Sequence, residues 1–310
     1  MNLLSHISKH SPVIMPFCAV FGFVFPHIAD AMLQWLPEIL FFLMFFALLG
    51  MNQKQLIVRL THAAVWRFAL LQCVGFCLLA GGAAYVFGVR GDLLLAIAAA
   101  GATAPLFGSV VMVKAVGFDP LEAMAQTIAA TLLMPLPLLL ILQLWAADGA
   151  ELNLWLYVQR LLIYIAGPIV LAVVLRRILP GDWLTRYYPE VGKFNVLLLM
   201  TFPIGLIGGY RHFFDQDPMA ALWFLGLGVL LVALFYFGTY WLYRRYGDDV
   251  AIPAALVCGG RNLILAYTIT TPFMGSLFLP LIGAMQLPIF SLPFIGKIMA
   301  RRYFAQQGKA

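Results

Sequence analysis

The residues with the clearest chemical potential are Arg261 and Asn262, which lie inside a long apolar stretch of the chain. A guanidinium at the depth of the hydrocarbon core costs roughly 3 kcal/mol or more, so such a cation usually faces a protein interior or a watery cavity. The neighbouring amide can both donate and accept hydrogen bonds. The first hypothesis is therefore a solute-binding site in the middle of a membrane.

Other uncharged polar residues also interrupt apolar segments, and their hydroxyl or amide groups are candidates for the same site. In membrane helices such groups more often bond their own backbone or bridge neighbouring helices. The candidates that join Arg261 and Asn262 as substrate-binding residues are Thr103, Ser109, Thr127, Thr131 and Gln286.

Groups that would support metal or enzyme chemistry form no recognisable pattern. The four cysteines, Cys18, Cys73, Cys77 and Cys258, lie in apolar segments without metal-ligand spacing, and we expect them to be packing residues. The chain has no nucleophile elbow, phosphate-binding loop or pair of intramembrane aspartates. We therefore expect neither an enzyme nor a metal site, and no cofactor.

The composition predicts a membrane protein. Of the 310 residues, 63% are hydrophobic and only 10% are charged, and the mean hydropathy is +0.95. A surface that faces water does not sustain this balance. The net charge of +6 comes from basic residues scattered at the ends of apolar segments, which does not suggest nucleic-acid binding. The expected partners are the bilayer and a small molecule; a monomer is one expectation, and the oligomeric state stays open.

A helix needs about 20 apolar residues to cross a bilayer. A window of that length predicts an all-α polytopic fold with ten transmembrane helices, at approximate limits 12–29, 35–51, 64–87, 92–114, 120–146, 154–178, 193–210, 219–243, 249–274 and 277–300. An even number of spans places both termini on one side. Most of the 19 basic residues fall on that side, which predicts cytoplasmic termini in a plasma membrane of bacterial type. Glu38 follows Pro37 near the expected start of the second span, where a carboxylate suits a helix N-terminus.

The two halves of the chain, residues 1–146 and 154–300, have the same organisation. In each half the fourth span is broken near its centre, at Gly101-Ala102-Thr103-Ala104-Pro105 and at Cys258-Gly259-Gly260. Five spans in each half require the second copy to be inverted. Inverted repeats with interrupted helices at matching positions indicate a secondary transporter with a midplane site. Proline and glycine are also common in ordinary membrane helices, so a purely structural explanation stays open.

Three segments carry a resemblance to a known family. Residues 39–56 (ILFFLMFFALLGMNQKQL) resemble the Met-Phe-rich second helix of the bile acid:sodium symporter family. Residues 100–137, and 257–262 with the helices after them, fall where that family has two crossing, unwound helices. The family belongs to the bile acid, arsenite and riboflavin transporter superfamily. The resemblance implies two inverted five-helix repeats, a panel domain of spans 1, 2, 6 and 7, a core domain of spans 3–5 and 8–10, and alternating access for organic anions.

The departures from the family pattern concern sodium. Ser109 and Thr127 match sodium-ligand positions of the family. At four other polar positions the family's asparagine, serine, glutamate and glutamine correspond here to Val110, Ala123, Val257 and Arg261. Two positive charges about 4 Å apart repel by roughly 4 kcal/mol at an effective dielectric constant of 20, so the guanidinium should abolish sodium binding beside it. Asn262 matches an asparagine that lines the substrate cavity in the family.

These observations lead to one main hypothesis. It is a carrier of a small organic anion that works without sodium, by uniport, exchange or proton coupling, with Arg261 as a built-in cation. Alternatively, Arg261 only caps helix carbonyl groups and touches no substrate. Three competing functions stay open: a sodium-coupled organic anion symporter, an anion channel and an arsenite-type efflux permease.

Overall fold

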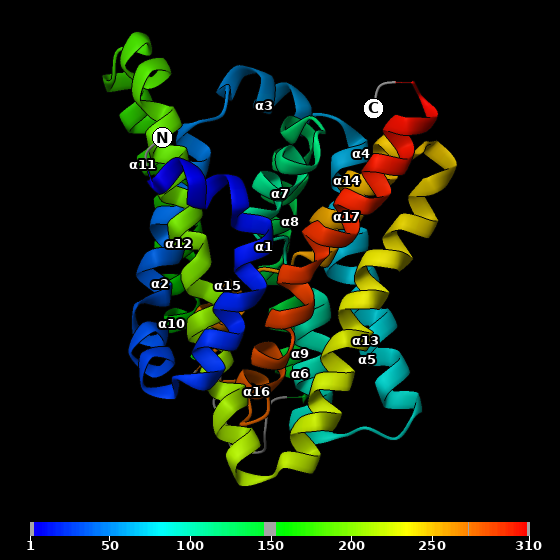
Figure 1. Ribbon diagram of the computed structural model, residues 1–310. Coiled ribbons are helices and arrows are strands. Elements are labelled where there is room, and N and C mark those ends of the chain that lie inside the picture. Colours follow the sequence, from blue (N-terminus) through cyan, green and yellow to red (C-terminus); the bar gives the residue numbers. More distant parts are fainter. Residues whose placement is uncertain (1–2, 146–152, 272, 309–310) are drawn as a thin grey trace.

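The chain is an all-helical, multi-pass membrane protein. The computed structural model describes residues 3–145, 153–271 and 273–308, and every regular element within them is a helix. The long helices stand side by side as a bundle, and the first turn of α1 and the last turn of α17 lie at the same end of it (Figure 1). In this part of the chain, seven helical stretches are long and apolar enough to cross a membrane: Pro26–Leu49, Ala63–Val86, Pro120–Trp145, Leu154–Ile178, Arg186–Gln216, Pro218–Tyr246 and Phe278–Gln306.

The helices follow one another with short connections. The first half contains α1 (Leu3–Val24), α2 (Pro26–Leu49), α3 (Gln53–Leu60), α4 (Ala63–Leu70), η1 (Leu71–Gly75), α5 (Phe76–Val86), α6 (Gly91–Ala102), α7 (Gly108–Val116), α8 (Pro120–Leu133) and α9 (Pro135–Trp145). The second half contains α10 (Leu154–Leu161), η2 (Leu162–Ala166), α11 (Gly167–Ile178), α12 (Gly181–Gln216), α13 (Pro218–Tyr243), η3 (Arg244–Tyr246), α14 (Asp248–Gly259), α15 (Leu263–Thr270), α16 (Phe278–Ala284) and α17 (Gln286–Gln306). The expected junction of the two halves, around residues 147–153, lies outside the described residues except for Asn153.

Two helical stretches are interrupted where the sequence predicts breaks. α6 ends at Ala102 and α7 begins at Gly108, while α14 ends at Gly259 and α15 begins at Leu263. Pro105 lacks a backbone N–H and cannot continue α6, and the glycine pair before Arg261 weakens the helix there. Both interruptions leave backbone groups that need partners from outside their own helix.

Several predicted boundaries are wrong. The second span begins at Pro26, because the chain turns at Phe25 immediately after α1. Pro37 therefore lies inside α2, and the prediction that Glu38 caps a helix N-terminus is wrong. α12 has 36 residues and extends well beyond the predicted limits 193–210 at both ends. Apolar windows detect the central part of a helix but not its polar extensions.

Some elements have no signal in a hydropathy window. α3 is an eight-residue helix that connects two candidate spans, and Asn52 caps its first turn by accepting hydrogen bonds from the N–H groups of Lys54 and Gln55. η1 and η2 are π-helical turns inside longer helices. Such bulges widen one turn and often occur at functional sites.

α12 is the centre of the packing, because α1, α2 and α16 all lie against it. The approach of α1 is close at Gly22, where a β-carbon would meet the carbonyl oxygen of Ile204 and lie 2.7 Å from Cγ2 of Ile207. Since backbone cannot move aside as a side-chain tip can, only glycine fits at this position.

We expect Gly22→Ala to destabilise the protein by about 1–3 kcal/mol, the usual cost of overpacking a dense interface. Gly82→Ala is the matched control, because a β-carbon on Gly82 in α5 would have nothing within 4 Å. The midpoint of thermal unfolding in detergent is to be measured for both purified variants. Equal midpoints for the two alanine variants would contradict the close packing of α1 on α12.

Candidate functional site

The two interrupted stretches meet at their breaks. Pro105 and Arg261 form an isolated antiparallel bridge. Around this pair, the N–H of Leu106 donates to the carbonyl oxygen of Gly260 at 2.6 Å, and the N–H of Asn262 donates to that of Ala104 at 2.7 Å. Backbone groups that the breaks release from the helices are thus satisfied by the opposite segment. We call this meeting point, residues 103–107 with 260–262, the crossing.

The guanidinium of Arg261 binds backbone carbonyl groups from the other half of the chain. Its Nη1 donates to the carbonyl oxygens of Gln72, Gly101 and Thr103 at 2.9, 3.1 and 2.8 Å. Gly101 and Thr103 lie at the carboxyl end of α6, where carbonyl groups lack intrahelical partners and carry partial negative charge. Gln72 lies in the π-helical turn η1. Arg261 therefore ties the carboxyl end of α6 and the bulge of η1 to the segment between α14 and α15.

Aromatic and sulfur groups enclose the same guanidinium, and Arg261 is only 2% exposed. The ring centroid of Phe235 lies 3.8 Å from Cζ, and that of Phe76 lies 5.4 Å away. Nη2 is 3.8 Å from Sγ of Cys258. A cation over an aromatic face is stabilised by about 2 kcal/mol when water is excluded. Nε is buried and has no hydrogen-bond partner.

Three of the other predicted residues lie at the crossing or bond directly to it. The Ser109 hydroxyl donates to the carbonyl oxygen of Gly260 at 3.2 Å and so binds the carboxyl end of α14. Asn262 caps α15, because its Oδ1 accepts a hydrogen bond from the N–H of Leu265 at 3.2 Å. Its Nδ2 is buried without a partner. Thr103 donates to the carbonyl oxygen of Ala100 at 2.8 Å, within its own helix end.

The remaining predicted residues are buried, but their side chains bond the local backbone. Thr127 donates to the carbonyl oxygen of Ala123 at 2.8 Å, and Thr131 donates to that of Thr127 at 2.7 Å. Gln286 donates to the carbonyl oxygen of Ile282 at 2.6 Å. These bonds one turn back along the helix are the local alternative to solute binding.

The space beside Arg261 is small in this conformation. A gap of about 10 Å³ separates the crossing from α12, roughly the minimum that holds one water molecule. Its walls are apolar apart from Arg261 and Gln286; the others are Leu106, Phe202, Leu206, Leu263, Ile264 and Phe290. A solute could reach Arg261 from this side only if α12 and the crossing moved apart.

Two residues that were not predicted as site residues bind backbone carbonyl groups of the interrupted stretches. Gln72, fully buried, donates from Nε2 to the carbonyl oxygen of Thr103 at 3.3 Å, while its Oε1 has no partner. Arg160 lies on α10, and its Nη1 donates to the carbonyl oxygen of Thr268 near the end of α15 at 2.5 Å. The sequence did carry a signal for Gln72, because a glutamine inside an apolar span needs a polar partner. No sequence pattern pairs Arg160 with Thr268.

No family model and no curated protein matches this chain. The family resemblance therefore depends on the sequence segments alone.

We expect Arg261→Lys to lower the free energy of unfolding by about 1–3 kcal/mol, because the shorter side chain places its ammonium one bond short of the three carbonyl oxygens that Nη1 binds and lacks the planar group that lies over Phe235. Arg90→Lys is the matched control. The Nη1 of Arg90 also donates to two carbonyl oxygens, those of Tyr85 and Val89, but the side chain is exposed. Thermal unfolding in detergent compares the two variants, and an equal, small loss in both would show that Arg261 does not hold the crossing together.

Proposed function

We propose that the protein is a secondary transporter that carries a small organic anion by alternating access, without coupling to sodium. We further propose that it is a divergent relative of the bile acid:sodium symporter family. The observation that carries this proposal is the guanidinium of Arg261, which is buried at the crossing and bonded to carbonyl groups of the opposite half of the chain.

The contacts of Arg261 support its role as a built-in cation. A bound sodium ion would need several oxygen ligands at the crossing. Here the carbonyl oxygens of Gly101 and Thr103 already accept hydrogen bonds from a permanent positive charge. A second cation about 4 Å away would be repelled by roughly 4 kcal/mol at an effective dielectric constant of 20. The anion would therefore move by uniport, exchange or proton coupling.

The unpartnered groups at the crossing are mainly donors, which supports an anionic substrate. Nε of Arg261 and Nδ2 of Asn262 are buried without acceptors, whereas Oε1 of Gln72 is the acceptor nearby that lacks a donor. α7 and α15 both begin directly after the segments of the crossing, and their N-termini carry partial positive charge. Two helix N-termini, a guanidinium edge and an amide N–H would together bind one carboxylate.

The proposed architecture counts α1, α6 with α7, and α14 with α15 as membrane crossings in addition to the seven candidate spans. The antiparallel pairing of Pro105 with Arg261 agrees with inverted repeats, since the two interrupted stretches run in opposite directions. Met134-Pro135-Leu136-Pro137 and Met285-Gln286-Leu287-Pro288 follow the breaks in the two halves with similar sequences. The first turn of α1 and the last turn of α17, which lie at the same end of the bundle, would then face the cytoplasm.

The small gap beside Arg261 suggests how the transport cycle would proceed. α12 belongs to the proposed panel domain and the crossing to the proposed core domain. In the present conformation, Phe202 and Leu206 of α12 close the space next to Arg261 and Gln286. Movement of the core relative to the panel would open this space to one side of the membrane at a time.

In proteoliposomes, we expect saturable uptake of a small carboxylate at the same rate in sodium and in potassium buffers. Arg261→Gln removes the charge and offers an amide where the bile acid:sodium symporter family has glutamine, so sodium should accelerate the residual uptake of that variant. A sodium gradient that drives uptake by the wild-type protein would refute the proposal. Unsaturable flux of many thousands of anions per second would instead indicate a channel.

Asn262→Ser tests substrate contact separately from folding. Serine is also a good N-cap, so α15 should keep its first turn and the midpoint of thermal unfolding should change little. The amide donor is lost, so we expect KM for the carboxylate to rise about tenfold, as expected for the loss of one hydrogen bond to a charged group. An unchanged KM in the variant would remove Asn262 from the binding site.

A further inference from the structure

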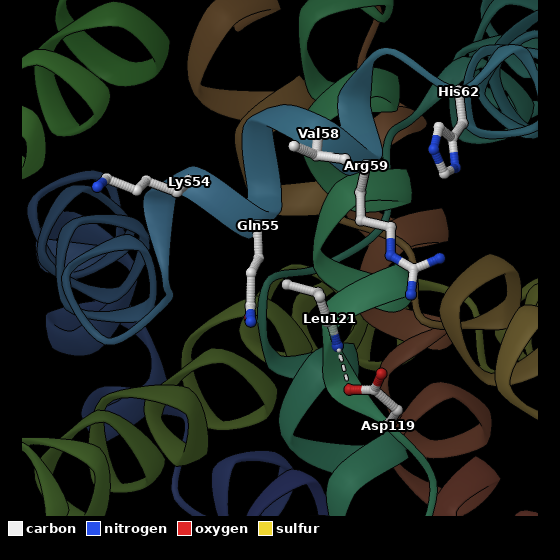
Figure 2. A pocket seen from close by; sticks show the side chains of 7 residues that line it. All are labelled: Lys54, Gln55, Val58, Arg59, His62, Asp119 and Leu121. Carbon is white, nitrogen blue, oxygen red and sulfur yellow. Dashed lines mark hydrogen bonds between the residues drawn. The ribbon is translucent and has the colours of Figure 1, made fainter.

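A polar hollow lies at the end of the bundle, under α3. This helix connects the candidate spans Pro26–Leu49 and Ala63–Val86, so it lies at the level where those spans leave the membrane (Figure 1). The hollow has a volume of about 730 Å³ and lies between α3 and the start of α8. Figure 2 shows the residues that line it: Lys54, Gln55, Val58, Arg59, His62, Asp119 and Leu121.

Opposite charges line this hollow without neutralising one another. Arg59 extends from α3 above Asp119, which precedes α8 (Figure 2). Among the described residues, Asp119 and Lys54 form no ion pair. Oδ1 of Asp119 accepts a hydrogen bond from the N–H of Leu121 at 3.0 Å, which leaves the other carboxylate oxygen available. The nearest anion to Arg59 is Glu122, at 3.6 Å, and both of these side chains are about 40% exposed, so the pair is weak.

Apolar side chains flank the charged ones on α3. Ile57 and Val58 are 63% and 58% exposed, whereas Leu56 is buried in the bundle. Trp66 donates from Nε1 to the carbonyl oxygen of Leu60 at 2.8 Å and so holds the carboxyl end of α3 near the start of α4. A short helix with exposed basic and apolar side chains, next to a tryptophan, is typical of a segment that lies in the plane of the membrane surface.

We propose that this hollow binds the headgroup of an amine-bearing phospholipid. The phosphate would contact Arg59, the ammonium would contact the free oxygen of Asp119, and the acyl chains would run along Ile57 and Val58. A phosphate with a primary ammonium two carbons away matches the separated charges of the hollow. This inference is independent of the transport function, since α3 takes no part in the crossing.

The chemistry of the hollow distinguishes this lipid from others. A phosphatidylcholine headgroup also carries a positive charge, but its methylated nitrogen cannot donate a hydrogen bond to Asp119. A phosphatidylglycerol headgroup has no cation, so Asp119 would repel it. Free phosphoethanolamine shares the headgroup chemistry but lacks the acyl chains that Ile57 and Val58 would contact.

The test is native mass spectrometry of the full-length protein with an equimolar mixture of dioleoyl phosphatidylethanolamine, phosphatidylcholine and phosphatidylglycerol. The wild-type protein should retain one phosphatidylethanolamine with a preference of about tenfold, the ratio that one charge-assisted hydrogen bond supports. Asp119→Asn keeps the oxygen that caps α8 and removes the charge, so the fold should persist while the preference is lost. Arg59→Gln should weaken the binding of all three lipids alike, because all three carry the phosphate.

Glu190→Gln is the control, since Glu190 is a carboxylate of the same chain that pairs with Lys193 away from the hollow. It should retain the wild-type preference. If Asp119→Asn behaves like Glu190→Gln, the proposal is wrong. Complete displacement of the lipid by soluble phosphoethanolamine would also overturn it, because the hollow would then belong to a soluble ligand.

Discussion

The arrangement of this protein depends on the hydrogen bonds between one buried guanidinium and the carbonyl groups of the opposite half of the chain. Removing a charge from water costs several kcal/mol, so a buried arginine persists only where donors and acceptors match well. Nη1 of Arg261 meets this condition with three carbonyl oxygens, and the face of Phe235 covers the guanidinium, while Nε has no partner. The same contacts satisfy a helix end, a π-helical turn and a backbone break, none of which could stay unpaired inside a bilayer.

The crossing shows why two interruptions are more stable together than one would be alone. Each break frees N–H and carbonyl groups that hydrocarbon cannot satisfy. The segments at Pro105 and Arg261 exchange backbone hydrogen bonds, and Ser109 and Asn262 add side-chain bonds to the helix ends. Nε of Arg261 and Nδ2 of Asn262 remain unpaired, and they are the donors that the proposed substrate would meet.

The hollow under α3 differs from the crossing in the exposure and pairing of its charged groups. At the crossing, charge is buried and bonded, whereas at the membrane surface Arg59 and Asp119 remain partly exposed and apart. Buried contacts of the first kind hold the fold together, and surface groups of the second kind contribute little to stability. Such groups can instead recognise a partner that brings matching charges, which here would be a component of the membrane itself.

The sequence by itself determined the membrane class, most of the helical segments and the positions of both breaks. Hydropathy depends on local composition, and Pro105 and the pair Gly259-Gly260 act on the backbone where they stand. It also singled out Arg261, because a lone cation in an apolar run needs an explanation. Helix ends were harder to predict: α2 includes Pro37, and α12 continues into polar sequence, since packing against neighbours outweighs local signals. Only the tertiary structure decided which carbonyl groups Arg261 binds, that Thr127, Thr131 and Gln286 bond their own helices, and that α3 faces Asp119. Those contacts join residues up to 189 positions apart, and no local pattern of residue types specifies which distant partner is met.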